Sequence, residues 1–287
     1  MTPQPLTVSD AAALAAIARI AGQKAGLHLP SAKFPMIHAR LRKRMRALGI
    51  ASLDHYRTLI ESPVGQSECD HMVMALTTHV SHFFREPHHF DLLRGTVLPP
   101  LVQRARQGGR VRLWSAGCAG GQEAYSLAMT VLQAMPDAAR HDVRLLATDI
   151  DRTVVDKARC GRFSAADLAH IPGPLARQFL QATPSGPELP ADMRRWMRFD
   201  VQNLHGHWPM RGGFDVIFCR NVLIYFDIPA RDRLLARFAG VLRPGGWLFL
   251  GHSERLSGPA GAAFDHAGRT AFRRRDTPAP AQPDLAT

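Results

Sequence analysis

The stretch "VRLWSAGCAGGQEAYSLAM", residues 111–129, decides the fold of this chain. An apolar run passes through a glycine-rich turn into a segment whose apolar residues recur at helical spacing. A turn built on Gly117, Gly120 and Gly121 between a strand and a helix lets backbone N–H groups approach a nucleotide-like ligand closely. Its GxxGG spacing departs from the dinucleotide pattern GxGxxG, so the turn predicts a ligand site without identifying the ligand.

Further apolar runs separated by helical segments continue this pattern towards the C-terminus. They read "VRLLATDI" (143–150), "WMRFDVQ" (196–202), "FDVIFC" (214–219) and "GWLFLGH" (246–252). Such alternation predicts a doubly wound α/β domain with a mostly parallel sheet. The segment "FDHAGRTAFRRR" (264–275) predicts a hairpin that closes the sheet with an antiparallel strand.

The N-terminal part has a different organisation. Short amphipathic helices are predicted over residues 8–25, 33–48, 52–61 and 68–78, which indicates a small all-α domain. At the other end, "RRRDTPAPAQPDLAT" has the Pro, Ala and charge composition of a disordered tail.

Composition indicates a globular protein of a reducing compartment. The chain has 287 residues, of which 46% are hydrophobic, enough to build real cores. Its four cysteines, none in CxxC spacing, predict neither structural disulfides nor a zinc site. The N-terminal apolar stretch has no Lys or Arg before it, and Arg19 interrupts it well short of a membrane span. We therefore expect a cytoplasmic protein without membrane insertion and without a bound metal.

The net charge of +12 is concentrated in one predicted helix, "KFPMIHARLRKRMRALG" (33–49). No acidic residue lies between Asp10 and Asp54, although eight Lys and Arg do. The helix has one apolar face, and its other faces carry Arg40, Arg42, Lys43, Arg44 and Arg46. This pattern predicts docking to an acidic protein or to phosphates, and the alternative is an ordinary solvated helix face.

Two acids predict the nature of the ligand. Glu123 opens the helix after the glycine-rich turn, where it either complements the helix dipole or binds the ammonium of an amino acid moiety. Asp151 or Thr153 can cap the next helix, which leaves Asp149 at the carboxyl end of a strand as an acceptor for ribose hydroxyls. S-Adenosyl-L-methionine, a nucleoside that carries an amino acid, fits both acids.

Two later segments add to this site. Asn203 and Leu204 follow a strand, where an amide and an apolar side chain can flank an adenine. Arg220 and Asn221 follow the next strand, in line with the other strand ends.

Taken together, the motifs resemble the CheR family of chemotaxis receptor methyltransferases. The resemblance spans about residues 10–275 and rests on "THVSHFFREPHHF", "SAGCAGGQEAYSLAM", "ATDID", "FDVQNL", "FCRNVLIYF" and "VLRPGGWLFLGHSE". It implies methyl transfer from S-adenosylmethionine to glutamates in the cytoplasmic helical bundle of chemoreceptors, with S-adenosyl-L-homocysteine as product. It also implies a class I methyltransferase domain. The boundaries that we expect are a helical domain over 1–78, a linker helix over 79–95, the methyltransferase domain over 96–275 and a tail over 276–287.

The resemblance implies the roles of individual residues. Where the family has Asn, Thr and Arg before the methyltransferase domain, this chain has His79, Ser81 and Arg85. Arg85 is expected to orient the incoming carboxylate, held in place by a linker helix that Phe83 and Phe84 anchor. The full set of cofactor contacts implied is His79, Ser81, Arg85, Gly117, Glu123, Asp149, Asn203, Leu204, Arg220 and Asn221. Tyr225 is a second candidate for substrate positioning, with a packed core tyrosine as the alternative.

The chemistry needs no general base, because a glutamate side chain with a pKa of about 4.3 is already an anion at neutral pH. Two other functions remain to be weighed. A nucleic-acid methyltransferase is disfavoured, because "CRNVLIY" stands where amino-methylating enzymes resemble a pattern of Asp or Asn, two prolines and an aromatic residue. Cys219 also lacks the adjacent proline of cytosine methylation. A receptor-docking regulator without methylation is the other alternative, suggested by His79 and Gln122.

Overall fold

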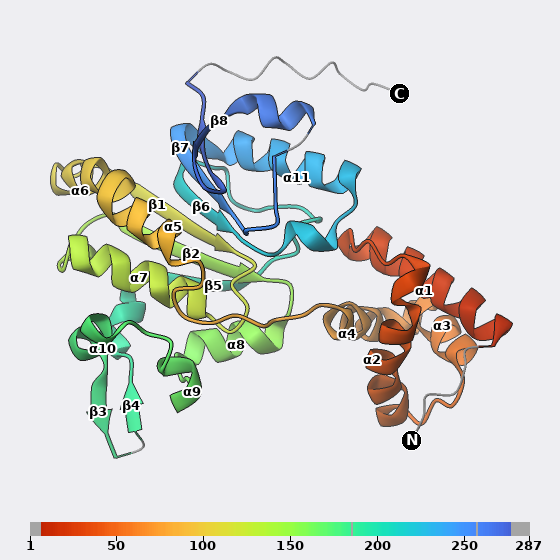
Figure 1. The fold of residues 1–287 in the computed structure, drawn as a ribbon. Coiled ribbons are helices and arrows are strands. Elements are labelled where there is room, and N and C mark those ends of the chain that lie inside the picture. Colours follow the sequence, from red (N-terminus) through yellow and green to blue (C-terminus); the bar gives the residue numbers. More distant parts are fainter. Residues whose placement is uncertain (1–6, 185, 257, 277–287) are drawn as a thin grey trace. The chain divides into compact units, whose positions relative to one another are not determined.

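The computed structural model describes residues 7–184, 186–256 and 258–276, so most of the tail expected at 276–287 lies outside the described residues. The chain forms two compact units. One comprises the residues up to Thr78 together with 205–207 and 225–230, and the other comprises the remaining residues from His79 onwards (Figure 1). Within the described residues, no helix is long and apolar enough to cross a membrane.

The first unit is all-helical, as predicted, and its helix ends agree with the prediction to within two residues. Its helices are α1 (Val8–Ala25), α2 (Phe34–Ala47), α3 (Leu53–Glu61) and α4 (Gln66–Leu76), with 3₁₀ turns η1 (Ser31–Lys33) and η2 (Pro63–Gly65). Thr7 and Asp10 form a capping box at the start of α1, and Gly26 ends that helix in the left-handed conformation (φ 71°). Apolar residues spaced at helical intervals, among them Leu14, Ile37 and Tyr56, are fully buried between the helices.

The second unit is built on a seven-stranded sheet in the order β5-β2-β1-β6-β7-β9-β8. The bounds are β1 (Val111–Ala116), β2 (Val143–Asp149), β5 (Met197–Val201), β6 (Phe214–Cys219), β7 (Leu242–Leu250), β8 (Phe264–Gly268) and β9 (Ala271–Arg274). The first five strands of that order are parallel, whereas β9 pairs antiparallel with β7 and with β8. The doubly wound fold is therefore confirmed, and the predicted closing hairpin contributes two strands.

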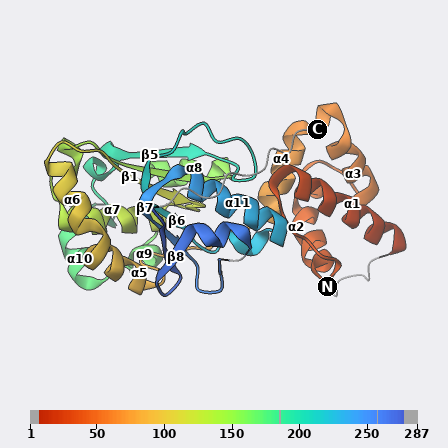
Figure 2. The same ribbon diagram turned by 90° about the horizontal axis from the view of Figure 1, so that it is seen from above.

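Helices cover this sheet because its strands are apolar on both faces. In β6, for example, every residue is buried. The helix α6 packs against β1, α7 against β2, and α8 against β2 and β5 (Figure 2). The helical segments of this part of the chain are α5 (Pro87–Leu92), η3 (Leu93–Val97), α6 (Leu98–Arg106), α7 (Gln122–Ala134), η4 (Ala138–Arg140), α8 (Arg152–Cys160), α9 (Ala165–Leu168), α10 (Gly173–Phe179), η5 (Ala191–Trp196), η6 (Leu223–Tyr225), α11 (Ile228–Val241) and η7 (Pro259–Ala263).

A small antiparallel hairpin stands apart from the main sheet. Its strands are β3 (Gln181–Thr183) and β4 (Gly186–Glu188), which lie near α9 and α10 in Figure 1. Each strand is three residues long, and Pro187 lies within β4 opposite Ala182. Because proline lacks an N–H, this hairpin offers only a short hydrogen-bonding edge.

The expected linker helix over 79–95 is wrong for its first eight residues, because the helix α5 begins only at Pro87. Phe84 and Glu86 have left-handed backbone angles (φ 51° and 57°), which a helix does not accommodate. The Phe84 N–H instead donates to the Ser126 hydroxyl on α7 at 2.9 Å. Phe83 and Phe84 are buried, as predicted, but they anchor an irregular segment rather than a helix.

Candidate active site

The turn after β1 is pulled tightly against the end of β2. The N–H groups of Gly117 and Cys118 donate to the Thr148 carbonyl at 2.8 and 2.9 Å. A Cβ atom on Gly117 would lie 2.4 Å from a methyl of Val222, and the φ of Gly117 is +87°. Only glycine fits there, so the turn passes close to its neighbours and leaves the space beyond the strand ends to a ligand.

Asp149 lies at the carboxyl end of β2 with 6% of its surface exposed. Its Oδ2 accepts a hydrogen bond from Ala119 N at 2.9 Å, and its Oδ1 accepts one from Asp151 N at 3.1 Å. His79 Nε2 lies 3.3 Å from Asp149 Oδ1, while His79 Nδ1 lies 3.7 Å from Asp151 Oδ2. A carboxylate has about four acceptor positions, so Asp149 retains capacity for a ligand hydroxyl. Asp151 caps α8 through Thr153 N, as predicted.

Glu123 lies in the first turn of α7, which follows the glycine-rich turn. Its Oε1 accepts a hydrogen bond from the Ser115 hydroxyl at 2.7 Å, and its Oε2 lies 3.4 Å from Arg220 Nη1. Burial raises the pKa of Glu123, and the opposing effects of Arg220 and Ser115 do not cancel this rise. The desolvation of the Glu123 carboxylate is therefore not fully offset within the protein, and a positively charged ligand group could offset the remainder.

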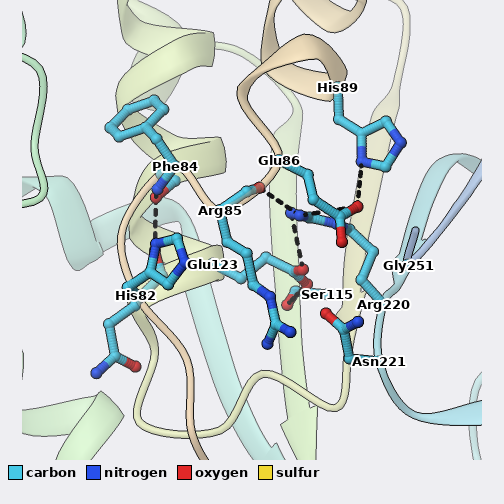
Figure 3. A network of polar contacts seen from close by, with 12 residues as sticks. His82, Phe84, Arg85, Glu86, His89, Ser115, Glu123, Arg220, Asn221 and Gly251 are labelled. Atoms are coloured by element: carbon cyan, nitrogen blue, oxygen red, sulfur yellow. Dashed lines mark hydrogen bonds and ion pairs between the residues drawn. The ribbon is translucent and has the colours of Figure 1, made fainter. Parts of the chain in front are cut away.

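Arg220 is enclosed, with only 2% of its side chain exposed. Its guanidinium contacts two carboxylates, with Nη2 3.3 Å from Glu86 and Nη1 3.4 Å from Glu123, and it donates a hydrogen bond to the carbonyl of Arg85 (Figure 3). The rings of Phe90 and Phe218 lie 5.7 and 5.8 Å from its centre. The side chain expected to contact a cofactor is thus already bonded within the protein.

Arg85 itself is only half-buried, and its Nη1 donates to the Val80 carbonyl at 3.3 Å. The side chains of Arg85 and Glu86 leave the linker in different directions (Figure 3). Ser81, four residues earlier, is partly buried. The guanidinium of Arg85 has few competing partners of its own, which suits a group that meets a substrate.

Glu254 was not predicted, although it belongs to the quoted "GHSE" segment. Its carboxylate accepts hydrogen bonds from Gly251 N at 2.6 Å and Asn221 N at 2.9 Å. Asn221 has a left-handed backbone (φ 60°), so Glu254 stabilises a turn that would otherwise be strained. Burial raises the pKa of Glu254. An acid four residues after a buried strand end was the available signal.

Glu86 also escaped prediction, and it belongs to a cluster with His88 and His89. One ligand atom from each lies within 4.8 Å of the others, the spacing of a possible metal site. Burial, assisted by Arg220, lowers the pKa of His89 to about 4, so its ring is neutral. However, the Arg220 guanidinium lies 3.3 Å from the Glu86 carboxylate, where it would repel a metal cation. We therefore assign no metal to this cluster.

The remaining predicted site residues lie as follows. Leu204 is buried, and its carbonyl accepts a hydrogen bond from Trp208 Nε1 at 3.2 Å, whereas Asn203 is partly buried. Tyr225 belongs to the helical unit, where its hydroxyl donates to the Thr78 carbonyl at 3.3 Å. Cys219 is fully buried, and burial raises the pKa of its thiol well above the usual value, which excludes it as a nucleophile.

The basic helix α2 differs from the prediction of one continuous docking face. Arg40 donates to the carbonyls of Leu76 and Thr77 at 2.7 and 3.1 Å, at the end of α4. Arg44 pairs with Glu68. Both arginines therefore stabilise the helical unit, and the exposed cations of this helix that the sequence singled out are Arg42, Lys43 and Arg46.

A buried tyrosine completes this internal network. The Tyr56 hydroxyl donates to Glu68 Oε1 at 2.7 Å, so the carboxylate that pairs with Arg44 has a second partner within the helical unit. Substituting Arg44 would leave the buried Glu68 carboxylate without one of its partners. A change in receptor methylation in such a variant would therefore not report on docking alone.

Comparison with known proteins identifies the family of this chain. Residues 79–272 match the family description "CheR methyltransferase, SAM binding domain", and residues 12–77 match "CheR methyltransferase, all-alpha domain". A probable chemotaxis protein methyltransferase of Rhizobium etli is 44% identical over 87% of this chain and 94% of its own length. A chemotaxis protein methyltransferase of Escherichia coli is 37% identical over 84% of this chain and 83% of its own length. The chain therefore belongs to the CheR family of S-adenosylmethionine-dependent chemotaxis protein methyltransferases.

Proposed function

We propose that this chain methylates glutamate side chains in the cytoplasmic helical bundle of methyl-accepting chemotaxis receptors, and that Glu123, Asp149 and Arg85 carry the reaction. The observation that supports this assignment is a pair of buried carboxylates, Asp149 at the end of β2 and Glu123 at the start of α7, beside a turn with no room for a side chain. Glutamate methyl esters formed in this way would serve sensory adaptation in the cytoplasm.

The residues present fit S-adenosylmethionine, whose sulfonium supplies an activated methyl group. Asp149 would accept hydrogen bonds from the ribose hydroxyls, and Glu123 would bind the ammonium of the methionine moiety. Asn203 and Leu204 would flank the adenine. His79 and Ser81, at the start of the linker, complete the cofactor contacts, with His79 acting through Asp149 and Asp151.

The substrate side of the reaction needs orientation rather than proton transfer. A receptor glutamate is already an anion at neutral pH, so its carboxylate needs no base. Attack on the sulfonium methyl removes charge, which a dry site favours over water. Arg85 would align the carboxylate through its guanidinium fork, and Tyr225 is a second group for positioning the substrate.

The activity is tested by incubating the protein with methyl-labelled S-adenosylmethionine and membranes that contain receptors. We expect label in the receptor that alkali releases as methanol, because a glutamate methyl ester is base-labile. Alkali-stable label would contradict the assignment and indicate nitrogen or carbon methylation. Cofactor binding without any receptor label would support the regulator without methylation.

Docking by α2 gives the next prediction. Replacing Arg42, Lys43 and Arg46 by glutamine should raise the KM for receptor about tenfold and flatten its dependence on salt, because each exposed charge contributes about 0.5 kcal/mol to an acidic partner. Cofactor affinity should stay unchanged. The measurement is initial methylation rate against receptor concentration at several salt concentrations.

A matched control removes three charges elsewhere. Arg195, Arg198 and Arg275 are exposed over 73, 78 and 52% of their side chains and form only surface ion pairs. Their replacement by glutamine changes the net charge equally. If this control raised the KM as much as the α2 variant, net charge rather than docking by α2 would explain the effect.

The short hairpin β3–β4 leads to a further prediction about receptor recognition. Family members that tether to a receptor's C-terminal peptide resemble one another in a small antiparallel subdomain whose edge accepts the peptide as a strand. Here that region carries Pro172, Pro174, Pro184, Pro187 and Pro190. We expect that truncating the receptor's C-terminal tail changes the methylation rate by less than about twofold. Micromolar binding of the isolated tail peptide would contradict this prediction.

A further inference from the structure

Glu86 follows Arg85 directly and makes more contacts than a linker residue needs. Its Oε1 accepts a hydrogen bond from His252 N at 3.0 Å and lies 3.1 Å from His252 Nδ1, while its Oε2 faces Arg220 at 3.3 Å. Burial alone would raise the pKa of Glu86, but Arg220 and the hydrogen bonds from His252 outweigh it, so the pKa lies below its usual value. The residue is an ionised carboxylate that joins the linker to the ends of β6 and β7.

Arg85 is thereby fixed on both sides through its backbone. On one side the Phe84 N–H is bonded to Ser126 on α7. On the other side the Arg85 carbonyl accepts a hydrogen bond from Arg220, and Glu86 is held as described. Left-handed backbone angles at Phe84 and Glu86 have an energetic cost that these bonds must offset. The direction in which the Arg85 side chain leaves the linker thus depends on Arg220 and Glu86.

The Arg220 guanidinium also contacts Glu123, the side chain that would bind the cofactor's ammonium. Arg220 Nη1 lies 3.4 Å from Glu123 Oε2, whereas its Nη2 lies 3.3 Å from Glu86 Oε2, so one guanidinium contacts both acids (Figure 3). Both carboxylates contact this one guanidinium, through different nitrogens. The two acids therefore compete for a single buried cation.

We propose that Glu86 and Arg220 are positioning residues that couple the segment carrying Arg85 to Glu123, the carboxylate that would bind the cofactor's ammonium. The proposal rests on the function proposed above for Arg85. If the ammonium of the cofactor were bound by Glu123, this carboxylate would gain a second cationic partner, and its competition with Glu86 for Arg220 would weaken. Arg220 then remains with Glu86 and the Arg85 carbonyl, and the linker is held more tightly. Cofactor binding thus prepares the residue that meets the substrate.

Hydrogen exchange with and without saturating S-adenosylhomocysteine tests this coupling. The amides of Phe84 and His252 report on the linker and on the Glu86 contact, respectively. In the parent protein we expect S-adenosylhomocysteine to slow the exchange of both amides about tenfold, which corresponds to about 1.4 kcal/mol. In Glu86→Gln, which keeps the shape but removes the charge, the slowing should fall below about twofold. Absence of slowing in the parent, or full slowing in Glu86→Gln, would overturn the proposal.

A matched control and a second variant make the result specific. Asp91→Asn removes a carboxylate that is 65% exposed on α5, and it should behave as the parent does. Arg220→Lys keeps the charge but lacks the fork that reaches three acceptors, so it should also lose the slowing of the Phe84 amide. If Arg220→Lys failed to fold, Glu86→Gln alone would decide.

Kinetics supply a readout that a purely structural role would not produce. At saturating cofactor, Glu86→Gln should lower the single-turnover rate of receptor methylation about tenfold with an unchanged melting temperature, because the orientation of Arg85 is lost. A parent-like rate would contradict the proposal. The exchange experiment requires only cofactor binding, so failure of receptor methylation would affect the function proposed above and leave the coupling test intact.

Discussion

Replacing Asp149 by alanine is expected to abolish measurable binding of S-adenosylhomocysteine while leaving the chain folded. The carboxylate lies at the strand end where a ribose would be held, and two charge-assisted hydrogen bonds contribute about 3–6 kcal/mol together. This loss lowers the affinity at least about a hundredfold. The variant also frees Ala119 N and Asp151 N, which adds a loosening of the turn to the direct loss. Isothermal calorimetry measures the affinity, and thermal unfolding checks the fold.

Two further variants separate the loss of the ribose contacts from the loosening of the turn. Asp149→Asn keeps an oxygen for one backbone N–H and should recover the fold stability but little of the affinity. Asp151→Asn preserves the cap of α8, because asparagine caps helices as well as aspartate does, and it should bind nearly as the parent does. Parent-like affinity in Asp149→Ala would refute the assignment of this site.

The strand ends could be predicted from sequence because their signals are local. An apolar run followed at once by a polar residue marks the end of a buried strand, and in a parallel sheet such ends gather at one edge. Asp149 was found in this way, and the structure places it at the end of β2. Glu123 was found as the acid that opens the helix after the glycine-rich turn, and it lies in the first turn of α7.

The contacts of Arg220 could not be predicted in the same way. Its partners Glu123 and Arg85 lie 97 and 135 positions away in the sequence, and no periodicity connects residues at such distances. The irregular linker was hidden for a related reason. Its left-handed residues are Phe84 and Glu86 rather than glycine, so the usual sequence signal for such a turn is missing.

Helix α2 shows how a correct local pattern can still mislead about function. Helical spacing separated an apolar face from a cationic one, and Ile37, Leu41 and Met45 on the apolar face are buried. Met36 and Leu48, which the same spacing places on that face, are exposed. The spacing contained no information about the end of α4, where a backbone carbonyl accepts a hydrogen bond from Arg40. Nor did it reveal that the buried Glu68 pairs with Arg44. Charge on a predicted helix face therefore identifies candidates for docking, and only the fold shows which of them are available.

Replacing Arg85 by alanine should give the largest loss of methylation that does not arise from weak cofactor binding. With receptor and cofactor both saturating, we expect the single-turnover rate to fall about a hundredfold, or about 2.7 kcal/mol, because the incoming carboxylate loses its aligning partner. Arg85→Lys should recover only part of the rate, since an ammonium keeps the charge but cannot align a carboxylate through two parallel bonds. The control is Arg94→Ala, which removes an arginine further along the chain whose side chain is 52% exposed.

The weak hold on the Arg85 side chain is part of this expectation. Its hydrogen bond to the Val80 carbonyl, at 3.3 Å, is long, whereas Arg220 contacts two carboxylates. Attack on the sulfonium consumes the negative charge of the carboxylate, so an arginine that bound that charge too strongly would slow the reaction. A guanidinium fixed through its backbone but loosely held at its tip can align the carboxylate and still release it. If Arg85→Ala methylated receptors within about threefold of the parent rate, the carboxylate would have to be oriented by another group, and Tyr225 would be the next residue to test.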